Sequence, residues 1–464
     1  MIKNLVLGLA ILSISSTLTA QSVSVDNGGA TVTPDGQWTT RVTFYSPSIV
    51  RVSKYPGATA PDKKSYSVIM QPESVTLGTE RKANGVTLKS SSLTASIGAD
   101  GNVRFSDSKG NLLLSESASS HAPCVNKVDE GRFKVSQSYN LDSAEVIFGL
   151  GQRQSPVLNQ RGQDVRMWCG NTNITIPYFT SDKGYGLYWD NAGDSRFTDI
   201  DNIASFTSEV APSIDYYFIY RDGTQDGVIA GIRSLTGEAT MFPIWTLGHW
   251  QCRERYKSSD ELCDVLDRYR ALEIPLDGMV QDWQYWGCDS NWNAMKFVNP
   301  HYINKMGDAK WMRYLPNDED PNAVYPDPRI KSPEEMVSYV HDNNSKLMIS
   351  IWANFGPWTD QYRELDKIGA LLPFETWPRN RGVRPYDPFN PKARDIYWKY
   401  LTNLYKMGID AWWTDSTEPD HFEAPGDADY MTHDGSWRSV KNAFALMTNK
   451  GIYLSLIHIS EPTR

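Results

Sequence analysis

Two aspartates in this sequence stand at the ends of short apolar runs, where a buried strand would reach solvent. Asp282 ends the run LDGMVQD, and Asp415 ends the run IDAWWTD. Trp352 ends a third run, KLMISIW, and Gln251 stands near the end of a fourth, WTLGHWQC. Two carboxyl groups, one ionised and one held protonated, can cleave a glycosidic bond. Aromatic rings stack on the apolar C–H face of a pyranose, so this combination of residues indicates chemistry on a sugar.

Composition and motifs exclude most other chemistries. The 464 residues include 16 Trp, 24 Tyr and 15 Phe, a supply of aromatic rings that suits carbohydrate contacts. Lys plus Arg number 46 against 55 Asp plus Glu, and there is no basic block, so nucleic acid is not expected as a partner. The sequence has no nucleophile elbow, no glycine-rich phosphate loop and no HExxH motif. The five cysteines are scattered, so no metal site, cofactor or disulfide framework is expected.

The elements that must position these residues alternate between apolar runs and helices. Ser258 and Ser332, each followed three residues later by Glu, predict two helix starts. Asn390 before a proline predicts a third start, and Gly408 predicts the end of that helix. Such alternation is the pattern of parallel βαβ units. The predicted strands lie at 245–252, 276–283, 346–352 and 409–415.

Four such units make half of a (β/α)8 barrel, which needs eight strands before every edge is paired. We therefore predict an incomplete (β/α)8 TIM barrel over 241–453, with a helix at 437–449 and a fifth strand beginning at Gly451. Residues 454–464 depart from that pattern and are interpreted as a non-native tail. Since an open parallel edge is unfavourable, the sequence favours a C-terminally truncated barrel.

The first half of the chain predicts a different architecture. From 21 to 240 the sequence has short alternating segments rich in β-branched and aromatic residues, such as 38–46 and 93–98, with turns such as Asp100-Gly101. This pattern is typical of an antiparallel β-sandwich. The change to strand and helix alternation places the domain boundary near 240, so the chain is predicted to be multidomain.

Residues 1–20 have the composition of an export signal. Lys3 precedes an apolar stretch at 5–14, and small residues lead to a cleavage position after Ala20. The stretch is too short to cross a bilayer, and no later stretch approaches the necessary length, so no membrane span is expected. We expect the mature protein to be exported, to the periplasm or outside the cell.

The segment 408–420, GIDAWWTDSTEPD, strongly resembles the nucleophile motif of glycoside hydrolase family 31, the family of α-glucosidases and α-xylosidases. The N-terminal domain is then expected to be the galactose mutarotase-like β-sandwich of that family. Together with shorter motifs, the resemblance covers most of the chain from 145 to 420, which makes it specific. The shorter motifs lie at 148–153, 162–168, 177–191, 235–237, 243–248, 274–277 and 349–352.

The resemblance implies a retaining mechanism, in which Asp415 attacks the anomeric carbon, forms a glycosyl-enzyme ester and is released by water. It also implies that Asp282 binds sugar hydroxyls in the −1 subsite and that Trp352 walls this subsite. Trp413 either walls the same subsite or packs in the core. The alternative role for Asp415 is a helix N-cap after its strand. Glu418 is expected to order the loop behind Asp415.

Two features depart from the family pattern. The expected general acid, an Asp in a Trp-x-Gly-Asp-like turn after the next strand, is absent from the sequence. We therefore expect negligible turnover of unactivated glycosides by this chain. In the sandwich, Asn171 stands where family members often have an Asp that reaches the +1 side, which leaves the leaving-group preference open. The carboxylates after the fourth strand are interpreted as parts of a solvated loop, and they are Asp420, Asp427, Asp429 and Asp434.

The choice of sugar depends on the space around C6, because xylose lacks the hydroxymethyl group that glucose carries. Trp283, next to Asp282, adds bulk and favours xylose. An α-xylosidase acting on xyloglucan-type oligosaccharides is therefore the first hypothesis, and an α-glucosidase is the second. An α-transglycosylase with the same nucleophile and a non-catalytic glycan-binding protein are further alternatives. The loop 289–326, with Trp292, either adds a platform for longer chains or covers the barrel.

Overall fold

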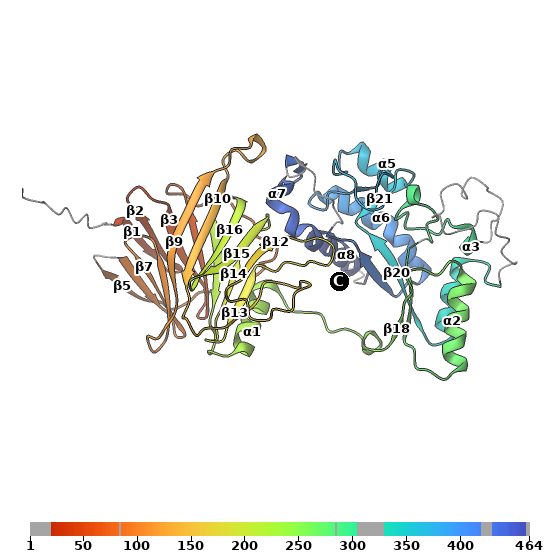
Figure 1. The fold of residues 1–464 in the computed structure, drawn as a ribbon, viewed down its shortest axis with the longest axis horizontal. Coiled ribbons are helices and arrows are strands. Elements are labelled where there is room, and N and C mark those ends of the chain that lie inside the picture. The colour runs from red at the N-terminus through yellow and green to blue at the C-terminus, as the bar shows by residue number, and fades with distance from the viewer. Residues whose placement is uncertain (1–19, 83–84, 284, 304–328, 419–428, 461–464) are drawn as a thin grey trace, which may run out of the picture.

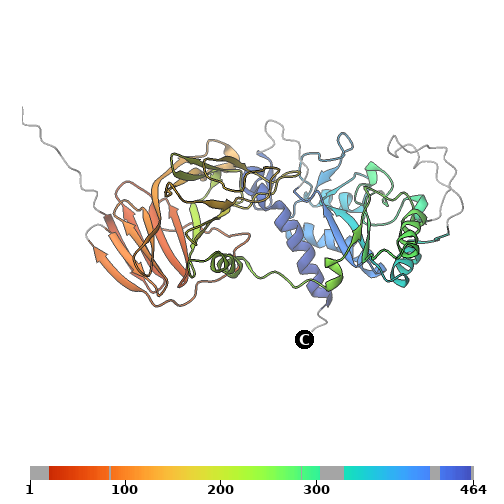
Figure 2. The ribbon, with the colours of Figure 1, turned by 60° about the horizontal axis from the view of Figure 1, so that its bottom comes forward.

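The computed structural model describes residues 20–82, 85–283, 285–303, 329–418 and 429–460. The predicted export signal up to residue 19, residues 304–326 of the predicted loop 289–326, and both Asp420 and Asp427 lie outside the described residues. Figures 1 and 2 show two bodies joined by an extended segment that follows helix α1 (Gln225–Thr236). The C-terminal helices lie between the two bodies.

The first body is a sandwich of two antiparallel sheets, as the sequence predicts. One sheet has eight strands, in the order β1 (Ala20–Asp26), β2 (Gly29–Pro34), β3 (Thr39–Ser46), β4 (Ile49–Tyr55), β17 (Ile214–Ile219), β14 (Gly186–Trp189), β13 (Tyr178–Ser181) and β11 (Ile147–Gly149). The other has nine, in the order β12 (Asp164–Met167), β15 (Ser195–Ile200), β16 (Ile203–Ala211), β10 (Phe133–Asn140), β9 (Leu112–Pro123), β8 (Val103–Asp107), β7 (Leu93–Gly98), β6 (Gly85–Lys89) and β5 (Gly78–Lys82).

Alternating side chains build the core between the two sheets. In β3, Val42 and Phe44 are fully buried, whereas the residues beside them along the strand are less so. Strand β7 repeats the pattern, with every second residue buried. Because successive side chains of a strand point to opposite faces, each strand contributes one apolar face. Phe105 of one sheet stacks on Phe218 of the other, with ring centroids 4.1 Å apart.

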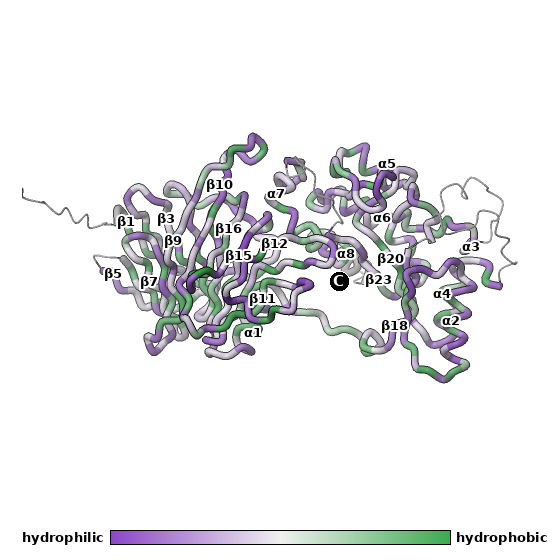
Figure 3. Tube along the Cα trace, in the orientation of Figure 1, coloured by the Kyte–Doolittle hydropathy of each residue, from purple (hydrophilic) through white to green (hydrophobic). Residues whose placement is uncertain are grey.

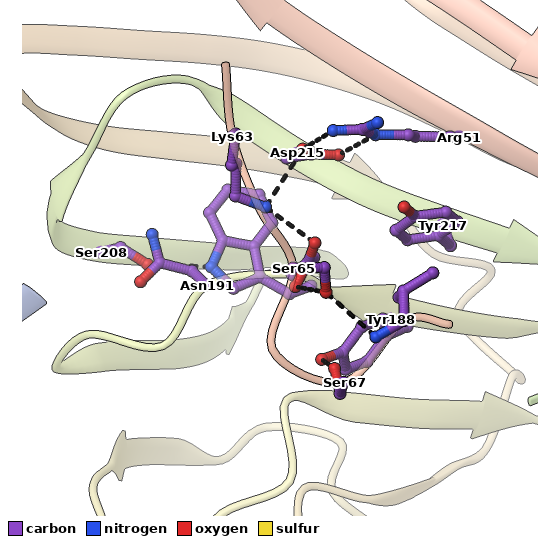
Figure 4. A network of polar contacts seen from close by, with 12 residues as sticks. Arg51, Lys63, Ser65, Ser67, Tyr188, Asn191, Ser208, Asp215 and Tyr217 are labelled. Carbon is purple, nitrogen blue, oxygen red and sulfur yellow. Dashed lines mark hydrogen bonds and ion pairs between the residues drawn. The ribbon is translucent and has the colours of Figure 1, made fainter. Parts of the chain in front are cut away.

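The segment between β4 and β5 has no regular structure and is fixed to the sandwich by an ion network (Figure 4). Lys63 Nζ lies 2.7 Å from Asp190 Oδ2 and 3.1 Å from Asp215 Oδ2. The Arg51 guanidinium donates two hydrogen bonds to Asp215, at 2.9 and 2.6 Å. The Ser65 hydroxyl donates to Asp190 at 2.9 Å. Both buried carboxylates therefore have cationic partners, which offset the cost of their desolvation.

The second body is a four-stranded parallel sheet, the partial barrel that the sequence predicts. Its strand order is β18 (Trp250–Gln251), β19 (Gly278–Gln281), β20 (Lys346–Trp352) and β23 (Ala411–Asp415). The longer helices are α2 (Ser259–Ala271), α4 (Pro333–Asp342), α5 (Asp360–Lys367), α6 (Pro391–Met407) and α8 (Phe444–Ser460). Shorter elements are α3 (Pro300–Ile303), α7 (Trp437–Val440) and the two-residue strands β21 (Asn354–Phe355), β22 (Arg384–Pro385), β24 (Met431–Thr432) and β25 (Gly435–Ser436).

The predicted helix ends are confirmed by the structure. The side chains of Ser258 and Ser332 each accept a hydrogen bond, at 3.1 Å, from the N–H three residues further on. Asn390 accepts from the N–H of Lys392 at 3.0 Å and so caps α6. Gly408 ends α6 with φ of 103°, a conformation that a side chain disfavours. Across the described ranges, no helix is both long and apolar enough to cross a bilayer.

The predicted strand at 245–252 is mostly wrong. A 3₁₀ turn, η2 (Ile244–Leu247), takes up its first part, and β18 keeps only two residues. Pro243 precedes the turn, and the Thr246 hydroxyl closes it by donating to the Pro243 carbonyl at 2.7 Å. Ile244 and Leu247 are 86% and 80% exposed, so no strand face is buried here. Figure 3 shows this exposed segment between α1 and β18.

The predicted fifth strand at Gly451 is also wrong, because helix α8 runs through this position. The predicted helix at 437–449 is instead divided into α7, the 3₁₀ turn η6 (Lys441–Ala443) and α8. Phe444 and Met447 are buried against the barrel core and so fix the start of α8. Once a helix has begun, each added residue gains one backbone hydrogen bond. The sequence of α8 contains no proline to stop that growth.

Candidate active site

The parallel sheet divides its side chains between a face covered by helices and a face that points to the barrel interior. Leu347, Ile349 and Ile351 of β20 are fully buried in the core that α4 and α6 share. Since successive side chains of a strand point to opposite faces, Ser350 and Trp352 lie on the interior face. The interior face is therefore the one that can meet a ligand.

Strand pairing brings four predicted site residues to one edge of this sheet. Trp352 pairs with Asp415, and Ser350 pairs with Trp413, in parallel register. The last residue pair between β19 and β20 is Gln281 with Ile349. Asp282 is the next residue after Gln281, so it lies level with Ser350. The C-terminal ends of parallel strands meet at one edge, which is where barrel enzymes keep their active sites.

The carboxyl of Asp282 sits in surroundings that favour its protonated form. Asp282 is 8% exposed, and this burial raises its pKa to about 6. Negative charge on Asp415 adds to the rise, which shows that the two carboxyls act on one another. The N–H of Trp283 donates to Asp282 Oδ1 at 2.7 Å, and this bond opposes the rise. A pair of carboxyls in different surroundings can take different roles.

Cys252, just past β18, also belongs to this edge, although it is not among the predicted site residues. Burial raises the pKa of its thiol, and negative charges on Asp282 and Asp415 raise it further. Gln251, which the sequence places at this edge, points instead toward the helices, because its Oε1 accepts a hydrogen bond from Tyr269 of α2 at 2.5 Å. Neighbouring strand residues face opposite ways, so only one of the two can face the interior.

Tryptophans gather behind this edge. The ring of Trp352 packs edge-to-face on Trp292, with centroids 4.8 Å apart, and Trp283 packs on Trp292 at 5.6 Å. The guanidinium of Arg255 lies 4.6 Å from the ring centroid of Trp283, a cation–π contact. Trp352 and Trp292 are 7% and 2% exposed, so this part of the long loop covers the barrel. Trp413, on the interior face, is 41% exposed.

The sandwich sends one loop toward the same region. Asn171 is exposed in the turn of this loop, which follows β12. Burial raises the pKa of the Cys169 thiol, and negative charge on Glu418, three residues after Asp415, contributes to the rise. The N–H of Cys169 donates to Asn442 Oδ1 at 2.9 Å and so anchors the loop to the barrel helices. The +1 role of Asn171 stays a prediction.

Two of the loop carboxylates have partners elsewhere. Asp429 forms an ion pair with Arg438 at 2.5 Å, and Asp434 accepts a hydrogen bond from the Tyr66 hydroxyl at 3.1 Å. Both carboxylates therefore have structural contacts, in line with their interpretation as loop residues. Within the residues that the structure describes, no group of three or more His, Cys, Asp or Glu is arranged to hold a metal ion.

Comparisons with known proteins match both bodies. A family model described as the glycosyl hydrolases family 31 TIM-barrel domain matches residues 239–464, and one described as the glycosyl hydrolase 31 N-terminal galactose mutarotase-like domain matches residues 39–197. An α-xylosidase of Saccharolobus solfataricus is 31% identical over 435 residues, which cover 90% of this chain and 54% of that protein. Alpha-glucosidase 2 of Bacillus thermoamyloliquefaciens is 25% identical over 450 residues, which cover 89% and 51%.

A solved structure shares the arrangement of the two bodies. The α-xylosidase from Xanthomonas citri matches with a TM-score of 0.82 at 24% sequence identity, over 95% of this chain and 63% of that chain. At this identity the likeness is one of fold. The chain spans about half the length of the two curated relatives above.

Proposed function

This chain belongs to glycoside hydrolase family 31, and we propose that it carries the nucleophile of a retaining α-glycosidase, Asp415. The proposed reaction removes a terminal α-linked sugar from an oligosaccharide or polysaccharide. The first proposed substrate is the α-xylosyl residue of xyloglucan-type oligosaccharides. The similarity to an α-xylosidase at 31% identity supports this choice over the second candidate, an α-glucosidase, whose example here is 25% identical.

One observation carries the proposal: Asp282 and Asp415 meet at the C-terminal edge of a parallel sheet, on its interior side. Strand register places Asp282 and Asp415 two residues apart along the strand direction, on the same face of the sheet, and the pKa of Asp282 responds to the charge of Asp415. Carboxyls with raised pKa values at the mouth of a barrel are typical of active sites. The partly exposed ring of Trp413 on the same face supplies a surface for a sugar.

In the proposed reaction the two aspartates have separate roles. The ionised carboxylate of Asp415 bonds to the anomeric carbon as the leaving group departs, and water then hydrolyses the ester. Asp282 accepts hydrogen bonds from sugar hydroxyls, and these bonds are strongest when its carboxyl is ionised, at a pH above its pKa of about 6. No residue of this chain is assigned as general acid. A test therefore needs a substrate whose leaving group departs without a proton, such as a glycosyl fluoride.

The surroundings of Trp283 support xylose as the preferred sugar. Its indole contacts the Arg255 guanidinium, 4.6 Å from the ring centroid, and Trp292, with centroids 5.6 Å apart. Both contacts restrict the movement of the ring away from a larger sugar. A hydroxymethyl group that meets such a wall changes selectivity by about 1–3 kcal/mol, or roughly 10- to 200-fold.

Covalent trapping tests the proposal. The chain is incubated with a 5-fluoro-xylosyl fluoride, and intact mass followed by peptide mapping locates the label. We expect one label per chain on Asp415, none in Asp415→Asn, and an unchanged label in the control Asp434→Asn, whose carboxylate contacts Tyr66. A folded wild-type chain without any label would contradict an enzymatic role and favour the glycan-binding alternative.

The same assay separates the remaining alternatives. A faster reaction with the 5-fluoro-glucosyl fluoride would move the assignment to an α-glucosidase. After labelling, release of the sugar is followed in water and with added acceptor sugars. Faster release with an acceptor, together with a larger product, would identify a transglycosylase.

A further inference from the structure

A fully buried carboxamide, that of Asn293, binds the main chain at the C-terminal end of β20. Its Nδ2 donates to the carbonyl of Trp352 at 2.6 Å and to the carbonyl of Asn354 at 3.1 Å. Its Oδ1 accepts from the N–H of Trp352 at 3.1 Å. Asn293 is 0% exposed, so bulk water does not compete for these groups. One side chain thus satisfies both main-chain polar groups of Trp352.

These bonds lie where strand pairing ends on one side of β20. Strand β19 pairs with β20 only as far as Gln281 and Ile349, whereas β20 continues to Trp352. The N–H and C=O of one strand residue point to the same side, so Trp352 needs a partner that offers an acceptor and a donor together. The carboxamide of Asn293 offers both and takes the place of a strand residue. A buried main-chain group left without a partner is unfavourable, because it has lost its hydrogen bonds to water.

Asn293 is itself held in place by its neighbours. Its φ of 56° lies in the left-handed region, which Asn adopts more easily than most residues. The carbonyl of Trp292 accepts from the N–H of Gly356 at 3.0 Å, and the side chain of Gln361 donates to the carbonyl of Ala294 at 2.7 Å. The residues on both sides of Asn293 are thus tied to the segment that follows β20.

The position that Asn293 fixes is next to the proposed nucleophile. Trp352 pairs with Asp415 across β20 and β23, and Tyr397 of α6 supplies a second brace by donating to the Trp352 carbonyl at 2.9 Å. We infer that Asn293 is a positioning residue, which sets the end of β20 and through it the place of Asp415. This inference rests on the proposed function. A misplacement of about 1 Å can lower a reaction rate about 100-fold.

The variant Asn293→Asp tests this role through pH, because a protonated carboxyl has nearly the shape of a carboxamide. The protonated form keeps the acceptor for the Trp352 N–H and one donor for its carbonyl, whereas the ionised form loses the donor and adds a buried charge. The measured quantity is the ratio of the labelling rates of variant and wild type with the 5-fluoro-xylosyl fluoride. At pH 4.5 we expect this ratio to lie within about threefold of one. At pH 7.5 we expect this ratio to be at least tenfold lower.

Other titratable groups near Asn293 are the same in the variant and in the wild type. Asp282, with a pKa of about 6, is present in both proteins, and the ratio of the two labelling rates cancels the titration that they share. Burial raises the pKa values of Tyr285 and Tyr397 well above 10, so these hydroxyls stay neutral over this range. Asp289, on the turn before Asn293, forms an ion pair with Arg381 at 3.0 Å and is likewise common to both proteins.

Gln137→Glu is the matched control in the sandwich. The Gln137 side chain is also 0% exposed, and its Nε2 donates to two carbonyls, those of Ala118 at 2.9 Å and Ser138 at 3.1 Å. The change of atoms is the same, but the site lies far from Asp415 along the fold. We expect this control to lose stability as pH rises. Its labelling rate, divided by the folded fraction that circular dichroism measures, should stay at the wild-type value.

The results separate the inference from the proposed function. A labelled wild type beside an Asn293→Asp ratio that stays constant with pH would overturn the inference alone. Parallel loss of labelling in Asn293→Asp and Gln137→Glu would overturn it too, because the effect would then be one of global stability. A wild type that takes no label overturns the proposed function and, with it, the inference. Tyr397→Phe, which removes the second brace only, should lower labelling severalfold at all pH values, and an unchanged rate would count against the role.

Discussion

The sandwich and the partial barrel bury their apolar surface in different ways. In the sandwich the inner faces of two sheets cover each other, and the core reaches both. In the barrel, helices cover one face of the parallel sheet, and the other face carries Asp282 and Asp415 and leaves Trp413 41% exposed. A sheet face that is only partly covered leaves room for solutes. The closed sandwich therefore supplies a frame, whereas the partly covered face of the barrel carries the candidate site.

The partners of buried carboxyl groups also differ between the two bodies. In the sandwich, Asp215 contacts two cations, Arg51 and Lys63. In the barrel, Asp282 lies near a second carboxylate, that of Asp415, and its pKa is raised. Balanced charges stabilise a fold, while an unbalanced carboxyl at a cleft is a mark of function. Substitutions in the two bodies test this contrast.

Asp215→Ala should lower the free energy of unfolding of the sandwich by about 3–5 kcal/mol, because Arg51 loses its carboxylate and Lys63 keeps only Asp190. Urea denaturation followed by circular dichroism measures this change. The control is Asp26→Ala, since Asp26 is 57% exposed beside its arginine and should contribute less than about 1 kcal/mol. Equal losses in the two variants would contradict the role of the buried network.

Asp282→Asn should stabilise the chain at neutral pH and leave its stability nearly unchanged in acid. The folded pKa of about 6 lies above the ordinary 3.8, so the stability from the protonated form is complete below pH 3.8 and lost as pH rises through 6. The difference between variant and wild type should therefore grow by about 2.5 kcal/mol between pH 4 and pH 7.5. Unfolding titrations at both pH values measure it.

In the sandwich, the carboxyl of Asp107 has a pKa shift of the opposite sign to that of Asp282. Hydrogen bonds from the side chain and N–H of Asn111 lower the pKa of Asp107, so its contribution to stability is present above its ordinary pKa and lost as pH falls. The free energy of unfolding of Asp107→Asn, relative to wild type, should therefore fall as pH rises. A pH trend of the same sign in Asp282→Asn and Asp107→Asn would remove the contrast between site and frame.

Asn442→Ala should weaken the contact between the two bodies. Its side chain donates to the carbonyls of Met167 at 3.0 Å and Gly193 at 2.8 Å, and accepts from the N–H of Cys169 at 2.9 Å. Their loss should lower stability by about 2 kcal/mol and separate the thermal unfolding of the two bodies into two calorimetric transitions. Asn449→Ala, on an exposed face of α8, should change stability by less than about 0.5 kcal/mol. A single unshifted transition in Asn442→Ala would show that other contacts couple the bodies.

Gly408→Ala in the barrel and Gly110→Ala in the sandwich have the smallest expected effects. Both glycines have positive φ, 103° and 90°, so each substitution should cost about 1 kcal/mol. At Gly408 the added Cβ would also come within 3.3 Å of Val337, whereas at Gly110 nothing lies within 4 Å. The melting temperature of Gly408→Ala should therefore be lower than that of Gly110→Ala. The reverse order would mean that the end of α6 is not closely packed.

Local signals predicted much of this fold because they act within a few residues. Ser332 and Asn390 cap their helices as expected, since a cap depends only on the residue and the next turn. Thr224 caps α1 in the same way, yet that helix was not expected inside a β-rich region. Gly451 lies within α8 because the buried Phe444 starts a helix that no proline interrupts over Phe444–Ser460. Tertiary packing overrode the pattern of the short segment there.

For the site, the sequence by itself determined which residues end the strands, because Asp282, Trp352 and Asp415 stand at the ends of apolar runs typical of buried strands. Only the tertiary structure decided which way a side chain faces, and so exchanged Gln251 for Cys252 at the site edge. It also brought in Asn293, about sixty residues away from the strand end that it braces. The physical reason is that alternation and capping are properties of neighbours in the chain, whereas facing and bracing depend on register and contacts between distant segments.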